Sequence, residues 1–438
     1  MGSEWKDCRL GDCITLLSGG TPSKSKPEFW GKGTPWVSAK DMKSFWLNGA
    51  QDCLTPLGAE SATRLVEPGT TLMLVRGMTL HNDIPISRVR TISAFNQDVK
   101  AVLPKGSLHP SYLPHLLVAL KPRLLSIVDA AGHGTGRLGT ETMMALPIQL
   151  PSGDTQQDIA RFADAIEGKI ALLRETNATL EAIAQAIFKS WFVDFAPVLA
   201  KAEGREPEGV PPEVANLFPS EFEESELGAI PKGWRVVSLK DITSKIGSGA
   251  TPRGGKEAYV EEGIALVRSQ NVYDSEFTWD GLARITDQQA AALSNVELFP
   301  GDVLLNITGA SILRTCVVDP GVLPARVNQH VAILRAKPEV PSHYIHQHLL
   351  RKSTKDYLMG MNAGASREAV TKGHIESVPV VLPPTMILRR FQEITSPGFA
   401  RVESNTAQVR HLTELRDTLL PRLMSGKLAI PDLSMESE

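Results

Sequence analysis

The stretch that decides the fold is residues 156–191, QQDIARFADAIEGKIALLRETNATLEAIAQAIFKSW. It contains no proline and only one glycine, so little in it interrupts a helix. Apolar residues recur at alternating intervals of four and three, which is the pattern of a coiled-coil seam. Asn177 is the only polar member of this seam, whose apolar members include Ile166, Ile170, Leu173, Leu180 and Ile187. We therefore predict one long helix that packs along a second helix.

A poorer seam lies 232 residues further along the chain. It contains Arg416, the amide residue Asn405 and the apolar residues Val402, Val409, Leu412, Leu419 and Leu423. Pro397 lies in the first turns of this second helix and is expected to kink or break it. Facing residues of an antiparallel pair have position numbers of constant sum, and a sum of 582 sets Asn177 against Asn405. Since a slipped register leaves amides unpaired in an apolar seam, we predict antiparallel packing in this register. The alternative is that each seam packs only on its own domain.

The segments that flank the helices are two diverged copies of one pattern. The pairs at an offset of 232 are Pro68-Gly69 with Pro300-Gly301, Asn96-Gln97 with Asn328-Gln329, and 147–151 with 379–383. Buried-strand patterns at 71–75 and 99–103 recur at 302–306 and 331–334. A helix pattern at 112–127, broken near Pro122, recurs at 344–358. Preserved spacing with few identical residues predicts two similar mixed α/β folds that do different versions of one job.

Composition describes a globular chain without an overall nucleic-acid signature. The 438 residues are 42% hydrophobic and 22% charged, which suits two or three domains. The net charge is −3, so a DNA-binding surface must be a local basic face. The four cysteines form no CxxC pair and are expected to be reduced thiols. Without a membrane-length apolar run or a signal peptide, we expect a cytoplasmic protein that contacts no membrane.

Enzyme motifs are missing from the sequence. There is no phosphate-binding GxxxxGK[ST] string, no GxSxG elbow and no amino-methyltransferase tetrapeptide. The triplet His343, His346 and His348 resembles a metal cluster, but 348 leaves the helix face that 343 and 346 share. We interpret it as a solvated helix face and expect no metal. A duplicated chain without catalytic residues in either copy favours a binding protein over an enzyme.

Two strings resemble a known family. LEAIAQAIFKSWFVDF at 180–195 and LRDTLLPRLMSGKL at 415–428 closely resemble the conserved helical regions of the specificity subunit of type I restriction-modification enzymes. The segments KAEGREPE at 201–208 and LGAIPKGW at 227–234 are similar to that family too. The resemblance covers essentially the whole chain.

The resemblance implies an α+β fold with two pseudo-symmetric mixed α/β target-recognition domains, separated by two long helices packed as an antiparallel coiled coil. The implied divisions are 1–152 for the first recognition domain, 153–196 for the first spacer helix, 197–230 for an acidic linker, 231–383 for the second recognition domain, 384–428 for the second spacer helix and 429–438 for a tail.

The resemblance also implies a function. Each domain would read one half of a split double-stranded DNA sequence, and the helices would set the unread spacer. The subunit would be non-catalytic and would bind no cofactor, whereas two modification subunits would methylate adenine N6 with S-adenosylmethionine and restriction subunits would use ATP and Mg. One alternative is an orphan or decoy specificity subunit without a restriction partner. Another is a stand-alone DNA methyltransferase, which the missing motifs oppose.

Candidate DNA contacts follow from chemistry, because Lys and Arg bind phosphate, Arg reads guanine and Asn or Gln reads adenine. In the first copy they are Ser38, Lys40, Lys43, Arg76, His81, Asn82, His133 and Arg137. In the second copy they are Arg268, Ser269, Gln270, Asn271, Asn306, Thr308, Arg314, Ser366 and Arg367. The duplicated Asn-Gln pairs are expected to brace the shared fold instead, since base readers should differ between the copies.

Overall fold

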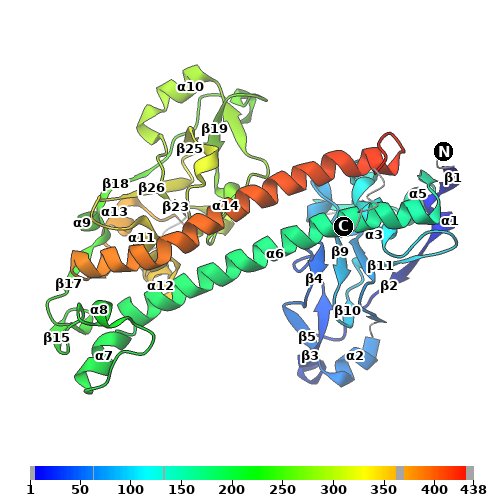
Figure 1. The fold of residues 1–438 in the computed structure, drawn as a ribbon. Coiled ribbons are helices and arrows are strands. Elements are labelled where there is room, and N and C mark those ends of the chain that lie inside the picture. Colours follow the sequence, from blue (N-terminus) through cyan, green and yellow to red (C-terminus); the bar gives the residue numbers. More distant parts are fainter. Residues whose placement is uncertain (1–4, 63, 132–133, 362–368, 431–438) are drawn as a thin grey trace, which may run out of the picture. The chain divides into compact units, whose positions relative to one another are not determined.

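The computed structural model describes residues 5–62, 64–131, 134–361 and 369–430. The chain forms two compact units (Figure 1). Unit 1 consists of Met1–Glu175 with Gln408–Glu438, and unit 2 consists of Thr176–Ala407. This division differs from the predicted domain boundaries because each of two long helices contributes to both units.

Unit 1 is built on a five-stranded sheet of order β2-β11-β7-β9-β4. These strands are β2 Ile14–Ser18, β11 Val99–Pro104, β7 Thr71–Leu74, β9 Ile86–Val89 and β4 Trp46–Leu47. The smaller sheets are β5-β3-β10-β6, β12-β13-β8 and β1-β14, formed by β5 Asp52–Leu54, β3 Trp30–Val37, β10 Ser93–Phe95, β6 Leu65–Val66, β12 Val128–Ala131, β13 Thr135–Leu138, β8 Arg76–Gly77, β1 Lys6–Arg9 and β14 Pro147–Leu150. The helices are α1 Leu10–Cys13, α2 Pro56–Ala62, α3 Tyr112–Ala119, α4 Lys121–Leu125 and α5 Thr140–Met144. The predicted strands at 71–75 and 99–103 and the broken helix at 112–127 are confirmed.

Unit 2 repeats this plan with a sheet of order β18-β26-β23-β24. These strands are β18 Thr243–Ser248, β26 Val331–Ala336, β23 Val303–Asn306 and β24 Thr315–Val317. The smaller sheets are β22-β19-β25, β20-β21, β17-β27 and β15-β16, formed by β22 Ala283–Ile285, β19 Ile264–Val267, β25 Ala325–Val327, β20 Val272–Tyr273, β21 Glu276–Phe277, β17 Arg235–Ser238, β27 Pro379–Leu382, β15 Phe222–Ser225 and β16 Gly228–Pro231. The shorter helices are α7 Ala196–Ala202, α8 Pro212–Ala215, α9 Leu239–Ile242, α10 Asp287–Ala292, α11 Ser342–Leu350, α12 Lys352–Met361 and α13 Lys372–Glu376. The helix predicted at 344–358 is thus two helices, α11 and α12.

The duplicated residues have the same role in both units. Thr21 Oγ1 donates a hydrogen bond to Gln97 Oε1 at 2.5 Å, and Thr251 Oγ1 donates to Gln329 Oε1 in the same way. The side-chain oxygen of Asn96 accepts the backbone N–H of Asp98 at 3.1 Å, and Asn328 accepts that of His330 at 3.1 Å. The prediction that the Asn-Gln pairs brace the shared fold is therefore confirmed.

A duplicated glycine stands beside each brace. A Cβ atom on Gly19 would lie 2.1 Å from the carbonyl oxygen of Phe95, and one on Gly249 would lie 2.1 Å from that of Val327. Any side chain at these positions would therefore push apart the segments that the Thr–Gln hydrogen bonds join. This close approach explains why both copies keep glycine just before the Thr-Pro pair.

The two long helices are α6 Gly153–Phe192 and α14 Thr385–Met424 (Figure 1). Helix α14 continues through Pro397, so this proline does not break the helix, whereas the kink that was the other expected outcome stays a prediction. Proline costs a helix roughly 3 kcal/mol through one lost hydrogen bond and a steric clash. Buried neighbours offset that cost, because Phe391, Thr395 and Phe399 all lie in the interior of unit 2.

The ends of the long helices are embedded in the cores of the two units. The core of unit 1 contains Ile159, Ala160 and Ala163 of α6 together with Leu420, Leu423 and Met424 of α14. The core of unit 2 contains Phe188, Trp191 and Phe192 of α6 together with Ile387, Leu388 and Phe391 of α14. Each unit therefore needs segments from both helices for its own stability.

The two seam amides meet as the sum of 582 requires. Asn405 Nδ2 donates to Asn177 Oδ1 at 2.8 Å, and Asn177 Nδ2 lies 3.2 Å from Thr406 Oγ1. Asn405 is fully buried. Most of the predicted apolar seam members are buried or half-buried, including Ile166, Ile170, Leu173, Leu180, Ile187, Val402, Val409, Leu412, Leu419 and Leu423. Antiparallel packing thus holds within each unit.

A buried ion pair forms a second polar layer between the helices, in unit 1. Arg416 Nη1 donates to Glu167 Oε1 at 2.6 Å, and the side chain of Glu167 is only 3% exposed. The seam pattern predicts the place of Arg416 but not its partner Glu167. The position numbers 167 and 416 add to 583, which differs by one from the sum of 582 for the two asparagines. One register of the helices therefore pairs the side chains in both polar layers.

The acidic segment 197–230, which was expected to be a linker, is folded. It contains helices α7 and α8 and the hairpin β15-β16. Its apolar residues Val198, Val214, Phe218 and Ile230 are buried in the core of unit 2. Glutamates dominate the local composition, but these four side chains decide where the segment packs.

Candidate nucleic-acid interface

Several loops of unit 1 meet at one edge of its sheets. Strands β3 and β10 run parallel and end together, with Phe95 opposite Val37. The backbone N–H of Asn96 donates to Val37 O at 3.0 Å, and that of Val75 donates to Asp98 O at 2.9 Å. Leu138 in turn donates to Val75 O at 2.9 Å. The loops that follow β3, β7 and β10 therefore lie beside β13, although they are distant in the sequence.

Four predicted DNA contacts gather on the β8 and β13 side of this edge. Arg76 and Arg137 are directly opposite each other on β8 and β13, and both are exposed. His81 ends the short 3-10 helix Met78–His81, and its Nε2 lies 2.7 Å from the carbonyl oxygen of Gly134, in the loop before β13. Asn82 follows and is exposed. The structure thus brings these basic and polar residues into one surface, whose contact with DNA remains a prediction.

The three candidates after β3 have different environments. Ser38 is buried, and its backbone N–H and hydroxyl both donate to Asp41 Oδ2 at 2.9 Å. Ser38 therefore closes a turn and is no longer a candidate for base contact. Lys40 is exposed and pairs with Asp52 at 2.8 Å. Lys43 is exposed and, within the described part of the chain, forms no ion pair, so it remains a candidate phosphate contact.

Unit 2 has the corresponding edge. Strands β19 and β25 run parallel and end together, with Val267 opposite Val327. The backbone N–H of Asn328 donates to Val267 O at 3.0 Å, and that of Ile307 donates to His330 O at 3.0 Å. The candidates at 268–271, 306 and 308 therefore lie at the end of unit 2 that matches the candidate edge of unit 1.

Two asparagines proposed as base readers in unit 2 are buried braces instead. Asn271 is fully buried, and its amide accepts the backbone N–H of Arg268 and donates to the carbonyl oxygens of Thr278 and Asp280. Asn306 is also fully buried, and its Nδ2 donates to the carbonyl oxygen of Ser269 at 2.8 Å. Neither side chain can reach a base, because its polar atoms hold loop backbone in the interior.

The other described candidates of unit 2 keep some exposure. The guanidinium of Arg268 lies 5.4 Å from the ring of Tyr259 and donates to Gly281 O. Gln270 is exposed, and its Nε2 contacts the same carbonyl oxygen at 3.2 Å. Arg314 lies 4.5 Å from the ring of Tyr273. Ser269 and Thr308 are half-buried. The remaining candidates lie outside the described residues and are His133, Ser366 and Arg367.

The histidine triplet of α11 is not the solvated face that we expected. His346 and His348 are buried, and the ring of His343 stacks on Phe399 at 3.5 Å. The Nε2 of His346 lies 3.2 Å from Thr315 O, and that of His348 lies 3.1 Å from Pro379 O. Among the described residues, no group of His, Cys, Asp or Glu has the geometry to hold a metal ion. The histidines of α11 face the interior because Tyr344, Ile345 and Leu349 of the same helix pack in the core of unit 2.

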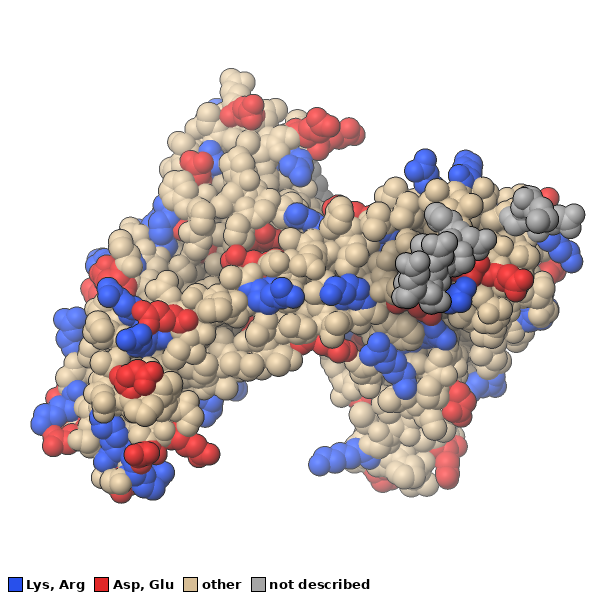
Figure 2. All heavy atoms as spheres, in the orientation of Figure 1, with Lys and Arg blue, Asp and Glu red and all other residues tan. Residues whose placement is uncertain are grey.

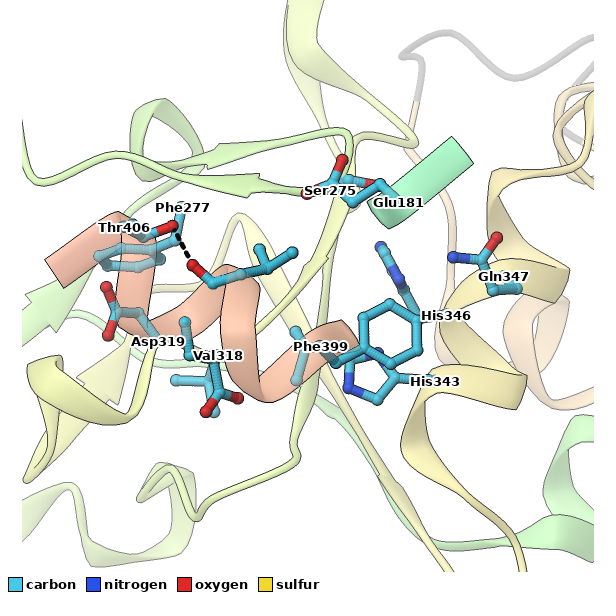
Figure 3. Close-up of a pocket in the computed structure, with 13 residues that line it drawn as sticks. Glu181, Ser275, Phe277, Val318, Asp319, His343, His346, Gln347, Phe399 and Thr406 are labelled. Carbon is cyan, nitrogen blue, oxygen red and sulfur yellow. Dashed lines mark hydrogen bonds between the residues drawn. The ribbon is translucent and has the colours of Figure 1, made fainter. Parts of the chain in front are cut away.

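Two of these histidines line a cavity of about 90 Å³ inside unit 2 (Figure 3). Helix α6 contributes Glu181, and helix α14 contributes Phe399 and Glu403. Burial, and secondarily the charge of Glu276, raises the pKa of Glu181 to about 7. Burial lowers the pKa of His343 to about 3. The cavity therefore favours the neutral form of the Glu181 carboxyl group and the neutral form of the His343 imidazole.

Lowering the pH from 7 to 5 is expected to destabilise unit 2. Burial lowers the pKa of His346 to about 4 and that of His348 to about 3, below the ordinary value of 6.5. The unfolded chain therefore takes up protons that the folded unit excludes. This stabilisation is complete above pH 6.5 and is lost as the pH falls toward the folded-state pKa values. We expect a loss of about 2 kcal/mol for each buried histidine at pH 5, measured by urea unfolding.

Two variants separate this effect from general acid sensitivity. His348→Gln should reduce the difference in stability between pH 7 and pH 5 by about 2 kcal/mol. The exposed His411 provides the matched control, and His411→Gln should leave the difference unchanged. Glu181 opposes the trend, because its raised pKa favours the folded state as the pH falls. Equal pH dependence in the two variants would contradict the assignment.

Charge is mixed on the face drawn in Figure 2. Among the described residues seen there, Lys and Arg side chains are interspersed with Asp and Glu. Surfaces that attract DNA through a long-range field carry one dominant sign. The described residues of this face show no such dominant sign.

No single helix among the described residues is long and apolar enough to cross a membrane, whereas the bent pair Gly153–Phe192 and Ala196–Ala202 passes by length and composition together. The apolar residues Phe188, Trp191 and Val198 of that pair are buried in the core of unit 2.

Comparisons with known proteins show which proteins this chain resembles. The family model of the type I restriction modification DNA specificity domain matches residues 2–182. The chain is similar to the type I restriction enzyme MjaIX specificity subunit of Methanocaldococcus jannaschii, with 26% identity over 452 residues that cover 98% of this chain and 95% of that protein. It is also 26% identical over 332 residues to the HindI specificity subunit of Haemophilus influenzae, covering 66% of this chain and 70% of that protein.

A solved structure supports the same assignment at the level of the fold. The S subunit of a type I restriction-modification system from M. genitalium matches with a TM-score of 0.55 and 13% identity, covering 96% of both chains. The family match and the similarity along nearly the full length agree with the resemblance of the two helical strings. The similarity of this chain to type I restriction enzyme specificity subunits therefore extends along nearly its full length.

Proposed function

We propose that the chain recognises a double-stranded DNA target of two separated parts, and that each unit reads one part. The observation that carries this proposal is the repeated edge. Both units have the same Thr–Gln and Asn braces beside it. The residues that those braces position differ between the units, as Arg76 and Thr308 illustrate. A shared frame with different edge residues suits two readers of different sequences.

We further propose that the long helices set the distance between the two half-sites. Two polar layers, Asn177–Asn405 and Glu167–Arg416, oppose slippage of one helix along the other. A shifted register would leave the polar side chains of both layers without their partners. A helix pair with a fixed register has a fixed length, at about 1.5 Å for each residue. The number of residues between the units would then determine the number of unread base pairs.

The partners follow from the same proposal. Two modification subunits would bind this chain and methylate adenine N6 with S-adenosylmethionine, and restriction subunits would bring ATP and Mg. The support is the similarity of this chain to specificity subunits along nearly its full length. An orphan or decoy subunit would bind modification subunits without a restriction partner. Co-expression with both kinds of partner shows whether restriction subunits join the complex, and this separates a complete system from an orphan or decoy subunit.

Lengthening both helices provides the test. One heptad inserted between residues 170 and 174 of α6, and another between 408 and 412 of α14, would keep both polar layers paired. The insertions add about 10 Å of helix, which corresponds to about three base pairs. We expect unchanged half-sites and a spacer about three base pairs longer when methylated adenines are mapped in DNA treated with the assembled methyltransferase.

Controls make the outcome interpretable. A heptad in α6 alone shifts the helices against each other and should abolish methylation. Altered half-sites with an unchanged spacer would contradict the role of the helices. The purified chain without partners should transfer no methyl group to DNA, and activity on its own would favour the stand-alone methyltransferase instead.

A further inference from the structure

The two units have different residues at one equivalent backbone pairing beside the candidate edge. In unit 1, Arg76 on β8 pairs with Arg137 on β13. In unit 2, Thr308 forms a bridge with Ala369. Each residue of the second pair lies 232 positions after its counterpart, which is the offset of the duplicated frame. The backbone contact is therefore shared by both units, whereas its side chains have changed completely.

The arginine pair of unit 1 places two positive charges side by side. Like charges opposite each other on antiparallel strands are destabilising. Asp129 lies on the other side of Arg137 in the sheet, but in the described part of the chain no carboxylate is within ion-pair distance of either guanidinium. Two exposed guanidinium groups with free donors fit a ligand with several acceptor atoms.

The corresponding pair in unit 2 has the opposite chemistry. The hydroxyl of Thr308 makes one hydrogen bond, to Nδ1 of His330 at 2.7 Å, which holds this hydroxyl toward the protein. Its methyl group and the methyl side chain of Ala369 carry no charge. Asp98 occupies the position of His330 in unit 1, so the partner has changed together with the pair. Such a surface suits an apolar group on the ligand.

We propose that these pairs read different bases, guanine in the half-site of unit 1 and thymine in the half-site of unit 2. A guanidinium donates two hydrogen bonds to O6 and N7 of guanine, whereas threonine and alanine methyl groups contact the C5-methyl group of thymine. This inference rests on the proposed function, since it names the chemistry that each recognition edge would read. Arg76 and Arg137 thereby act as specificity-determining residues, in addition to any attraction that they exert on phosphate.

The test exchanges the side chains of the two pairs between the units. The assembled methyltransferase then selects the DNA sequences that it binds from a random library. The wild-type complex should select a two-part sequence with guanine in one part and thymine in the other. The double variant R76T/R137A should lose the guanine preference by roughly 5- to 150-fold at one or two positions. The other half-site should stay unchanged. The reciprocal variant T308R/A369R should gain a guanine preference in the second half-site only.

Conservative variants keep the test decisive if an exchange disturbs folding. Thr308→Val retains the methyl group and should keep the thymine preference, whereas Thr308→Ser removes the methyl group and should weaken that preference. Lys43→Ala is the control for a phosphate contact in unit 1, and it should weaken binding equally for all sequences and reduce the salt dependence.

The outcomes distinguish this inference from the proposed function. If R76T/R137A weakens binding uniformly, as Lys43→Ala should, the arginines contact phosphate and the inference is wrong. If the selected half-sites contain no guanine that depends on this pair, the inference is also wrong, although two-part recognition stands. If the wild-type complex selects no two-part sequence at all, the proposed function itself fails.

Discussion

Replacing Arg416 by leucine should lower the free energy of unfolding of unit 1 by about 3–5 kcal/mol. The variant leaves the carboxylate of Glu167 without its partner at a site where only 3% of that side chain is exposed. An unpaired buried charge costs this much because the protein interior solvates it poorly. Burial by itself lowers the pKa of Arg416, but the charges of Glu167 and Asp417 outweigh it and raise the pKa above its ordinary value. Urea unfolding followed by circular dichroism measures the loss.

A double variant shows whether the loss comes from the orphaned carboxylate. R416L combined with E167L removes both charges and should recover most of the stability, because apolar replacements of a buried ion pair are often neutral. The exposed pair of Arg161 and Asp158 on α6 is the matched control. Arg161→Ala should cost less than about 1 kcal/mol. A loss for R416L no larger than that of the control would show that the ion pair does not anchor the helices.

Truncating Phe391 to alanine should destabilise unit 2 by about 3–5 kcal/mol. The ring is fully buried. Its centroid lies 5.2 Å from that of Phe192, 6.1 Å from that of Phe188 and 6.4 Å from that of Trp191. The smaller side chain leaves a cavity where α14 meets α6, and three aromatic neighbours lose contacts. Hydrogen exchange of backbone amides in unit 2 should report the loss.

The same helix offers a control with a different exposure. Ile394 lies less than one turn from Phe391 in sequence and is 40% exposed. Ile394→Ala should change stability only slightly, because little packed surface is lost. Faster exchange confined to unit 1 in Phe391→Ala, or equal effects of the two variants, would contradict the placement of Phe391 in the core of unit 2.

The helix register was accessible from the sequence because its signals are local and periodic. A period of 3.5 residues marks which face is buried, and one amide in each seam limits the possible alignments. The hydrogen bond between Asn177 and Asn405 follows from that arithmetic. The Thr–Gln braces were visible only as repeated residues, and their bonding required the fold.

The candidate edge was harder to predict because exposure in loops depends on distant segments. Ser38, Asn271 and Asn306 are polar residues in or beside loops, as DNA contacts are, yet all three are buried. Backbone carbonyl groups at 278 and 280 enclose the side chain of Asn271. The residues next to position 271 in the sequence give no indication of that contact. By contrast, the pairing of Arg76 with Arg137 links positions 61 apart and could be recognised only after β8 and β13 were placed.

The histidines of α11 and the acidic segment were misjudged for the same reason. Polar composition favours a solvated surface on average. In both places a minority of apolar residues decides the outcome, with Tyr344 and Leu349 burying one face of α11 and Phe218 burying the acidic segment. Burial of the histidine rings is then a consequence of their neighbours.

The discontinuous make-up of unit 1 has a consequence for synthesis on the ribosome. Its strands emerge early, but Leu420, Leu423 and Met424 of its core are translated after all of unit 2. At about 5–20 residues each second, the 232 residues from 176 to 407 take roughly 10–50 s to appear. During that interval the nascent first unit has an incomplete apolar core, while the inserted second unit can close. Unit 1, which is encoded first, is therefore the unit that finishes folding last, and it is the part most exposed to aggregation or chaperone binding.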